Sequence, residues 1–338
     1  MTTRITGYVP RRVVAVALSA AFAAGAIGAP AAVAQDDAAD APEIAFIQTA
    51  PFPYYERGVE GARMAADALG VSLTVLNSDS SAEQEIANVE DAITKGVDGI
   101  VLFSVGRASE EAALAKANEA GIPVAVLYGY APELEDMGAV FVQADINQTG
   151  AMAGEWLAAN VPSGKVAIVQ GALGRGDAEA YTASFKEALA ANPDLEIVGE
   201  PTGGWVRDQA LTVMQDLLTA HPDLAGAFVQ NEDMALGALQ AIKAADASVT
   251  IVSQNGSPDG LGAVETGEIA ATVGWSPAQE AQMALTRLVA TINDGTVTDP
   301  KLCNTPVTLV TAENLDEASP WIPSEESTAA SLVAECGA

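Results

Sequence analysis

Residues 207–245 read RDQALTVMQDLLTAHPDLAGAFVQNEDMALGALQAIKAA. Apolar residues recur at helical intervals up to Ala220, and a His-Pro turn follows, so a helix is expected over residues 207–220. The apolar run 225–229 indicates a buried strand, and residues 234–245 indicate a second helix. A strand without polar positions between two amphipathic helices is typical of a parallel sheet that helices cover on both faces.

The same alternation extends from this unit in both directions along the chain. Further strands are expected at residues 44–48, 71–76, 99–103, 122–127, 166–170, 195–198, 249–252, 270–273 and 306–310. Further helices are expected at residues 54–69, around 86–93, and at 108–120, 149–160, 177–191 and 277–293. These strand–helix units are too many for one open sheet of usual size. The sequence therefore predicts an α/β fold of two doubly wound, parallel-sheet lobes.

Ligands of such sheets bind at the carboxyl ends of the strands. The candidate contacts therefore lie in the loops after Gln48, Phe103, Leu127, Gln170, Val229 and Val252, where aromatic and amide residues are found.

The first 34 residues have the three parts of an export signal. Arg4, Arg11 and Arg12 form a basic start, residues 13–29 are apolar and small, and Ala32-Val33-Ala34 fits an A-x-A cleavage site. The apolar stretch is short for a membrane span, so we expect a cleavable signal peptide (1–34) and a linker (35–42). The Arg11-Arg12 pair leaves both general secretion and twin-arginine export open.

The charge and the cysteines add two expectations. The chain carries 45 Asp plus Glu against 15 Lys plus Arg, a net charge of −30, which repels phosphate backbones and excludes nucleic acid as an expected partner. Export leads to an oxidising compartment, so the two cysteines, Cys303 and Cys336, are expected to form a disulfide that pins the tail.

Five stretches follow one another along the chain: Pro53-Tyr54-Tyr55, Ile86 to Asp91, Val213 to Asp223, Gln230 to Ala238 and Asn255 to Gly260. Taken together and in this order, they resemble the ribose- and galactose-binding family of type I periplasmic binding proteins. The resemblance covers residues 43 to about 310. It implies two Rossmann-like lobes joined by three crossing strands near Asp145, Trp275 and Thr308. It places residues 43–144 and 276–307 in an N-terminal lobe, and residues 145–275 and 308–338 in a C-terminal lobe.

The family's function is implied with the fold. Members close around a ligand in the cleft between the lobes and dock on the permease of an ABC transporter. We expect a monomer without cofactor or metal, in the periplasm or secreted. Repressors of sugar operons share the core, but a signal peptide stands here in place of their DNA-binding helices.

By resemblance, aromatic rings and amides form the binding site. Tyr54 and Tyr55, beside Phe52, occupy the aromatic positions of the first loop, Trp205 that of the second lobe, and Asn231 a ligand-binding amide position. Ring faces stack on the C–H faces of sugars, and an amide offers both a donor and an acceptor to a hydroxyl. The alternatives are that the tyrosines fill the core and that Asn231 caps a helix.

Other positions depart from the family pattern. Tyr128-Gly129 replaces an Asp-Arg pair, Glu179 replaces an Arg, and Asn255, preceded by Gln254, replaces an Asp. Trp275 stands for a Gln and Ser104 for an Asn. These changes predict an apolar, aromatic and slightly negative pocket that suits a small neutral carbohydrate or polyol. Two alternatives remain: an amine-bearing or nucleoside-like ligand held by Glu179, and a sensory protein that signals to a chemoreceptor.

An enzyme is not expected. The single histidine, His221, lies in a His-Pro turn away from the strand ends, and no nucleophile elbow, P-loop or histidine–carboxylate metal motif is present.

Overall fold

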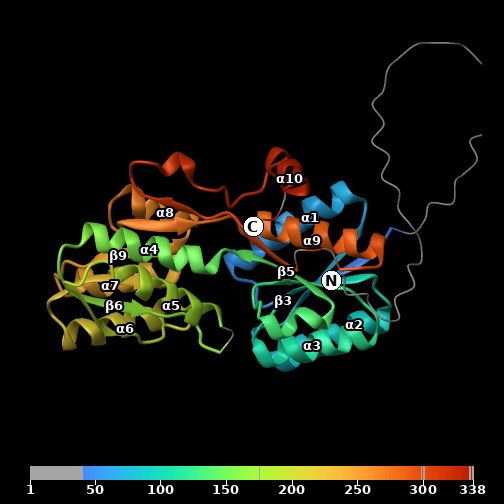
Figure 1. The fold of residues 1–338 in the computed structure, drawn as a ribbon, viewed down its shortest axis with the longest axis horizontal. Helices are drawn as coiled ribbons and strands as arrows, with labels where there is room; N and C mark the ends of the chain where they lie inside the picture. The colour runs from blue at the N-terminus through green and yellow to red at the C-terminus, as the bar shows by residue number, and fades with distance from the viewer. Residues whose placement is uncertain (1–40, 175, 298, 300, 335, 337–338) are drawn as a thin grey trace, which may run out of the picture.

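The computed structural model describes residues 41–174, 176–297, 299, 301–334 and 336, which form two lobes side by side (Figure 1). The predicted signal peptide and most of the linker lie outside these residues. Each lobe has a six-stranded sheet, ordered β11-β5-β4-β3-β1-β2 in the first and β12-β10-β9-β8-β6-β7 in the second. All pairings are parallel except that of β10 with β12.

The first sheet is covered by α1 and α9 on one face and by α2 and α3 on the other (Figure 1). Its strands are β1 (Glu43–Gln48), β2 (Ser72–Asn77), β3 (Gly99–Phe103), β4 (Val124–Leu127), β5 (Ala139–Ala144) and β11 (Leu302–Thr305). Its helices are α1 (Pro53–Leu69), α2 (Ala82–Lys95), α3 (Arg107–Glu119) and α9 (Pro277–Asp294), with a 3-10 segment η1 (Pro132–Met137) between β4 and β5.

In the second lobe, α4 packs against α5 and α6 packs against α7. Its strands are β6 (Gly164–Val169), β7 (Leu195–Gly199), β8 (Leu224–Val229), β9 (Thr250–Asn255), β10 (Ala271–Gly274) and β12 (Thr308–Val310). Its helices are α4 (Ile146–Asn160), α5 (Asp177–Leu189), α6 (Arg207–Ala220), α7 (Glu232–Ala244) and α8 (Pro258–Glu265). The chain passes between the sheets after β5, after β10 and after β11.

Two strands of the first sheet were not predicted, β5 and β11. Of the strand predicted at 306–310, only residues 308–310 are observed, as β12, and Pro306 lies between β11 in the first sheet and β12 in the second. Proline has no N–H to donate to a sheet, so it marks the place where the chain leaves one sheet for the other.

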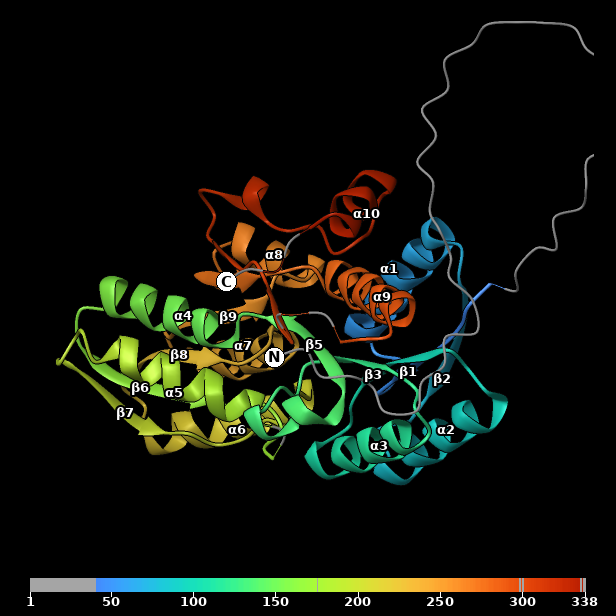
Figure 2. The same ribbon diagram turned by 45° about the vertical axis from the view of Figure 1, so that its right-hand side comes forward.

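The tail does not stay with the second lobe as predicted. After β12 and a 3-10 turn, η2 (Leu315–Glu317), the chain returns to the first lobe, where α10 (Glu325–Leu332) packs on α1 and α9. Figure 2 shows α10 above these two helices from a second direction. The Nε2 group of Gln282 on α9 donates to Oγ1 of Thr328 over 2.8 Å, which attaches α10 to the first lobe. Cys303 and Cys336 form a disulfide.

Candidate functional site

Aromatic side chains gather at the carboxyl ends of the strands of the first sheet. Tyr54 lies in the first turn of α1, where Pro53 at the start of the helix needs no N–H partner. The centroid of its ring lies 5.6 Å from that of Tyr55, 5.9 Å from Phe103 and 6.4 Å from Tyr128. Tyr55 packs edge-on against Phe103 as well, at 4.9 Å. The structure thus brings together three predicted residues, Tyr54, Tyr55 and Tyr128, around the ring of Phe103, which was not among the predicted site residues.

A buried carboxyl group accepts hydrogen bonds from two tyrosines of this cluster. Glu280, on the first turn of α9, accepts a hydrogen bond from the Tyr54 hydroxyl at Oε2 (2.7 Å) and one from the Tyr128 hydroxyl at Oε1 (2.9 Å). The indole N–H of Trp275 donates to the Tyr54 oxygen over 3.0 Å. Trp275 and Tyr128 are themselves buried. The network therefore fixes three of the predicted site residues by way of a fourth residue, Glu280, that was not predicted.

Burial raises the pKa of Glu280 to about 7, and the hydrogen bonds from Tyr54 and Tyr128 act in the opposite direction. Burial, followed by the charge of Glu280, holds the pKa values of Tyr54 and Tyr128 well above their ordinary value. Both phenols therefore remain hydroxyl donors at neutral pH, while the carboxyl group changes its charge near pH 7.

Trp205 is the aromatic residue predicted for the second lobe's share of the site. Its backbone has a φ of 67°, in the left-handed region that few non-glycine residues adopt, and its ring is partly buried against the core. The ring lies directly on Gly171, in the loop after β6, where an added Cβ would overlap Cζ2 and Cε2 of the indole. Glycine at position 171 is thus a requirement for this placement of the tryptophan.

The amide positions of the second lobe lie at the ends of β8 and β9. Asn231 caps α7, because its Oδ1 accepts from the backbone N–H of Met234 over 2.7 Å. This is the structural role weighed above, and it still leaves the Nδ2 group without a partner among the described residues. The backbone carbonyl of Asn255 accepts from the Trp275 backbone N–H (3.2 Å), and the Nε2 group of Gln254 donates to the Gln230 carbonyl (3.1 Å).

Three other predicted site residues, Ser104, Glu179 and Phe52, differ in burial and in their contacts. Ser104 is buried and donates to Oε1 of Glu85 within the first lobe (3.1 Å). Glu179 is exposed, and its carboxylate accepts from the Gly174 backbone N–H over 2.8 Å. The buried acid of this loop is Asp177, at the start of α5. Phe52 is 57% exposed and lies at the edge of the aromatic cluster, so it is a rim residue.

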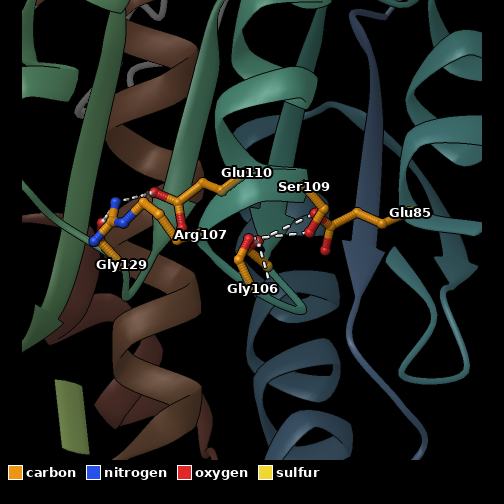
Figure 3. Close-up of polar contacts among 7 residues, drawn as sticks. Glu85, Gly106, Arg107, Ser109, Glu110 and Gly129 are labelled. Atoms are coloured by element: carbon orange, nitrogen blue, oxygen red, sulfur yellow. Dashed lines mark hydrogen bonds and ion pairs between the residues drawn. The ribbon is translucent and has the colours of Figure 1, made fainter. Parts of the chain in front are cut away.

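Arg107, the first residue of α3, lies between the lobes and was not among the predicted site residues. Its Nη1 lies 3.1 Å from Oε1 of the buried Glu110 and donates to the Gly129 carbonyl over 2.5 Å, as Figure 3 shows. An added Cβ on Gly176, in the second lobe, would lie 3.6 Å from its Nη2. The loop after β6 therefore meets the loop after β3, so the carboxyl ends of the two sheets face one another.

Other kinds of site find no support in the described part of the chain. His221 follows the last residue of α6 as its C-cap. No group of three or more His, Cys, Asp or Glu side chains there is arranged to hold a metal ion. None of the helices within the described residues is long and apolar enough to cross a membrane.

Comparisons with known proteins agree with this architecture. A family model described as a periplasmic binding protein domain matches residues 45–296. The ribose import binding protein of Escherichia coli (strain K12) is 35% identical over 235 residues, which is 69% of this chain and 78% of that protein. The xylitol-binding protein of Mycolicibacterium smegmatis is 32% identical over 261 residues, which is 76% of this chain and 74% of that protein.

A solved structure resembles this one closely. It is an ABC transporter solute binding protein from Mycobacterium smegmatis with bound glycerol, and it is 30% identical with a TM-score of 0.75 over 82% of this chain and 96% of that chain. The fold class and the family resemblance predicted from the sequence are confirmed. By its two facing parallel-sheet lobes and by these matches, the chain belongs to the periplasmic binding protein family.

Proposed function

We propose that this chain is an exported solute-binding protein of an ABC importer, which acts as a monomer and captures a small neutral sugar or polyol between its lobes. The observation that carries the proposal is the aromatic cluster of Tyr54, Tyr55 and Tyr128 at the strand ends that face the second lobe. Aromatic faces bind the C–H faces of sugars, and proteins similar to this chain are named for ribose and xylitol.

The charges near the cluster disfavour an anionic ligand. Glu280 and Asp177 are buried acids, and the guanidinium of Arg107 is already paired with Glu110. An anion beside the cluster would meet the carboxyl group of Glu280, and moving charge into such surroundings is costly unless it is paired. The buried Oε1 of Gln254 has no hydrogen-bond partner among the described residues, and a ligand hydroxyl would satisfy it.

Isothermal titration calorimetry of the mature protein tests the ligand class. The panel contains D-ribose, xylitol, glycerol and myo-inositol as neutral compounds, and ribonate as an anionic control of similar size. We expect saturable binding of at least one neutral compound and none of ribonate. Absence of binding to every sugar and polyol would remove this assignment.

The same panel decides whether an amine is the ligand instead, an alternative that the buried carboxyl group of Glu280 favours. Binding of a compound with an amino group, and of no neutral polyol, would replace the sugar assignment. Glu179→Gln is expected to leave the affinity unchanged, whether the ligand is a neutral polyol or an amine. The Glu179 side chain is exposed, and its carboxylate already accepts a hydrogen bond from the Gly174 N–H.

Export of the chain is part of the same proposal. Mass spectrometry of the protein recovered from the periplasm or the medium is expected to find Gln35 as the first residue, since cleavage is predicted after Ala34. Full-length protein retained in the cytoplasm would contradict this expectation. Uptake of the bound solute that is lost when the gene is deleted would support delivery to a permease.

Asn231 allows capping and ligand binding to be separated. Serine is as good an N-cap as asparagine, so Asn231→Ser is expected to change the free energy of unfolding by only a few tenths of a kcal/mol. The same change removes the Nδ2 donor and is expected to weaken sugar binding by about 1 kcal/mol, or roughly fivefold. Asn231→Ala is the matched variant that also loses the cap, at about 1 kcal/mol of stability. Calorimetry that finds wild-type affinity in Asn231→Ser would restrict Asn231 to capping.

A further inference from the structure

The C-terminal tail forms a fourth connection between the lobes. It leaves the second lobe after β12, where Leu315 packs against the core of that lobe. It then returns to the first lobe, where Thr328 on α10 accepts from Gln282 on α9. The match to the periplasmic binding protein family ends at residue 296, so this return path lies outside the matched region.

The disulfide closes this connection into a covalent loop. Cys303 lies on β11 of the first sheet, and Cys336 follows α10, 33 residues later in the sequence. Between them the chain visits the second sheet as β12, which pairs with β10. The loop from 303 to 336 therefore starts and ends on the first lobe and is attached to the second lobe in between.

Trp321 lies in the return path and contacts a wall of the site in each lobe. Its side chain is buried, at 7% exposure, although its neighbour Ile322 is 61% exposed. The indole N–H donates to the Asn255 carbonyl at the end of β9 over 2.9 Å. The indole ring packs edge-on against Tyr54, with the ring centroids 5.7 Å apart. The tail thus joins a first-lobe binding position to a second-lobe binding position.

We propose that Trp321 is a positioning residue of the binding site, which sets the angle between the lobes by tying the Tyr54 wall to the end of β9, and that the disulfide-closed tail holds it there. This inference rests on the proposed function. The tail is attached to the second lobe through β12 and to the first lobe through α10, so rotation of the lobes is expected to alter its contact with Tyr54 or with Asn255. Only a contact that differs between two states can shift the equilibrium between them.

Ligand affinity gives the first test, with D-ribose and xylitol as the probes. Trp321→Phe keeps a ring beside Tyr54 and loses only the bond to Asn255, so the dissociation constant is expected to rise roughly three- to tenfold. Trp321→Ala loses both contacts and is expected to raise it more than about tenfold. Ile322→Ala is the matched control, because the Ile322 side chain is exposed, and its dissociation constant is expected to stay within about twofold of wild type.

The second test needs no ligand and measures the distance between the lobes. Spin labels are attached to cysteines introduced at Glu119 on α3 and Glu187 on α5, which are both exposed. The native cysteines are bonded to each other and do not react with the label. In the ligand-free protein, Trp321→Ala is expected to broaden the distance distribution, and so is the double change Cys303→Ser/Cys336→Ser. Ile322→Ala is expected to match wild type.

The outcomes of the two tests separate this inference from the proposed function. If wild type binds neither D-ribose nor xylitol, the sugar assignment loses its support and the distance distribution alone decides the role of Trp321. A Trp321→Ala protein with the wild-type distance distribution would overturn the inference, whatever its affinity or melting temperature. Broadening in Trp321→Ala, with Trp321→Phe between it and wild type, would support it.

Discussion

Replacing Gly171 with alanine is expected to raise the dissociation constant for the bound sugar at least roughly tenfold and to lower the free energy of unfolding by about 1–3 kcal/mol. The added methyl group would overlap the indole of Trp205. The glycine cannot move aside, because its N–H donates to Oε1 of Gln230 (2.9 Å) and its carbonyl accepts from the Thr202 hydroxyl (2.6 Å). The indole must therefore leave its position at the proposed site.

The matched control for this prediction is Gly262→Ala. Gly262 lies within α8, and an added Cβ there would meet no atom within 4 Å. Alanine is the better helix former, so this variant is expected to be slightly more stable than wild type and to bind equally well. Urea unfolding and calorimetry measure both quantities. Equal binding by Gly171→Ala and Gly262→Ala would show that the placement of Trp205 does not matter to the ligand.

The alternation of strands and helices made most of the fold predictable, and the exceptions have a physical cause. Parallel strands are usually joined through a helix, and β5 follows β4 through only the 3-10 segment η1. The apolar run Ala139–Ala144 was therefore not assigned as a strand, because the helix that should precede it is absent from the pattern. Strand β11 is short and only partly apolar, and nothing in its sequence states which sheet it joins.

The site was predictable where chemistry is concentrated locally and not where it depends on distant contacts. Consecutive tyrosines at a strand end signal a binding loop within a few residues. Glu280 lies in the first turn of α9, where acidic residues are common because they interact favourably with the helix dipole, so its sequence position does not mark it as a site residue. Its partners Tyr54 and Tyr128 lie 226 and 152 residues away. Only the fold brings these groups together.

The sequence predicted Glu179 as the acid of the pocket, whereas the buried acid at the start of α5 is Asp177, and this difference has a geometric reason. Each residue of an α-helix advances by about 100°, so two residues differ by about 200° and lie on opposite sides of the helix. An alignment without gaps selects the acid by its position in the sequence, whereas burial depends on the face of α5 that meets the protein. Asp177 is on the buried face and Glu179 on the exposed one.

Raising the pH from 5 to 8 is expected to destabilise the wild-type protein by about 2–3 kcal/mol more than the variant Glu280→Gln. The folded protein holds the pKa of Glu280 at about 7, above the ordinary carboxyl value of 4.5. Between these two values the folded state binds a proton that the unfolded state has released. The free energy of unfolding therefore falls as the pH rises through this window, and the whole loss is present above the folded pKa.

Urea unfolding of both proteins at intervals between pH 5 and 8 measures this difference. Burial also raises the pKa of Glu232 to about 7, but Glu232 is present in both proteins, so its contribution cancels. The glutamine keeps the size of the side chain and the acceptor for one tyrosine, and it cannot lose a proton. Parallel curves for the two proteins would mean that Glu280 stays charged throughout. A wild-type curve that falls more steeply than the variant's as the pH rises would instead place the proton on Glu280 below neutral pH, between the hydroxyls of Tyr54 and Tyr128.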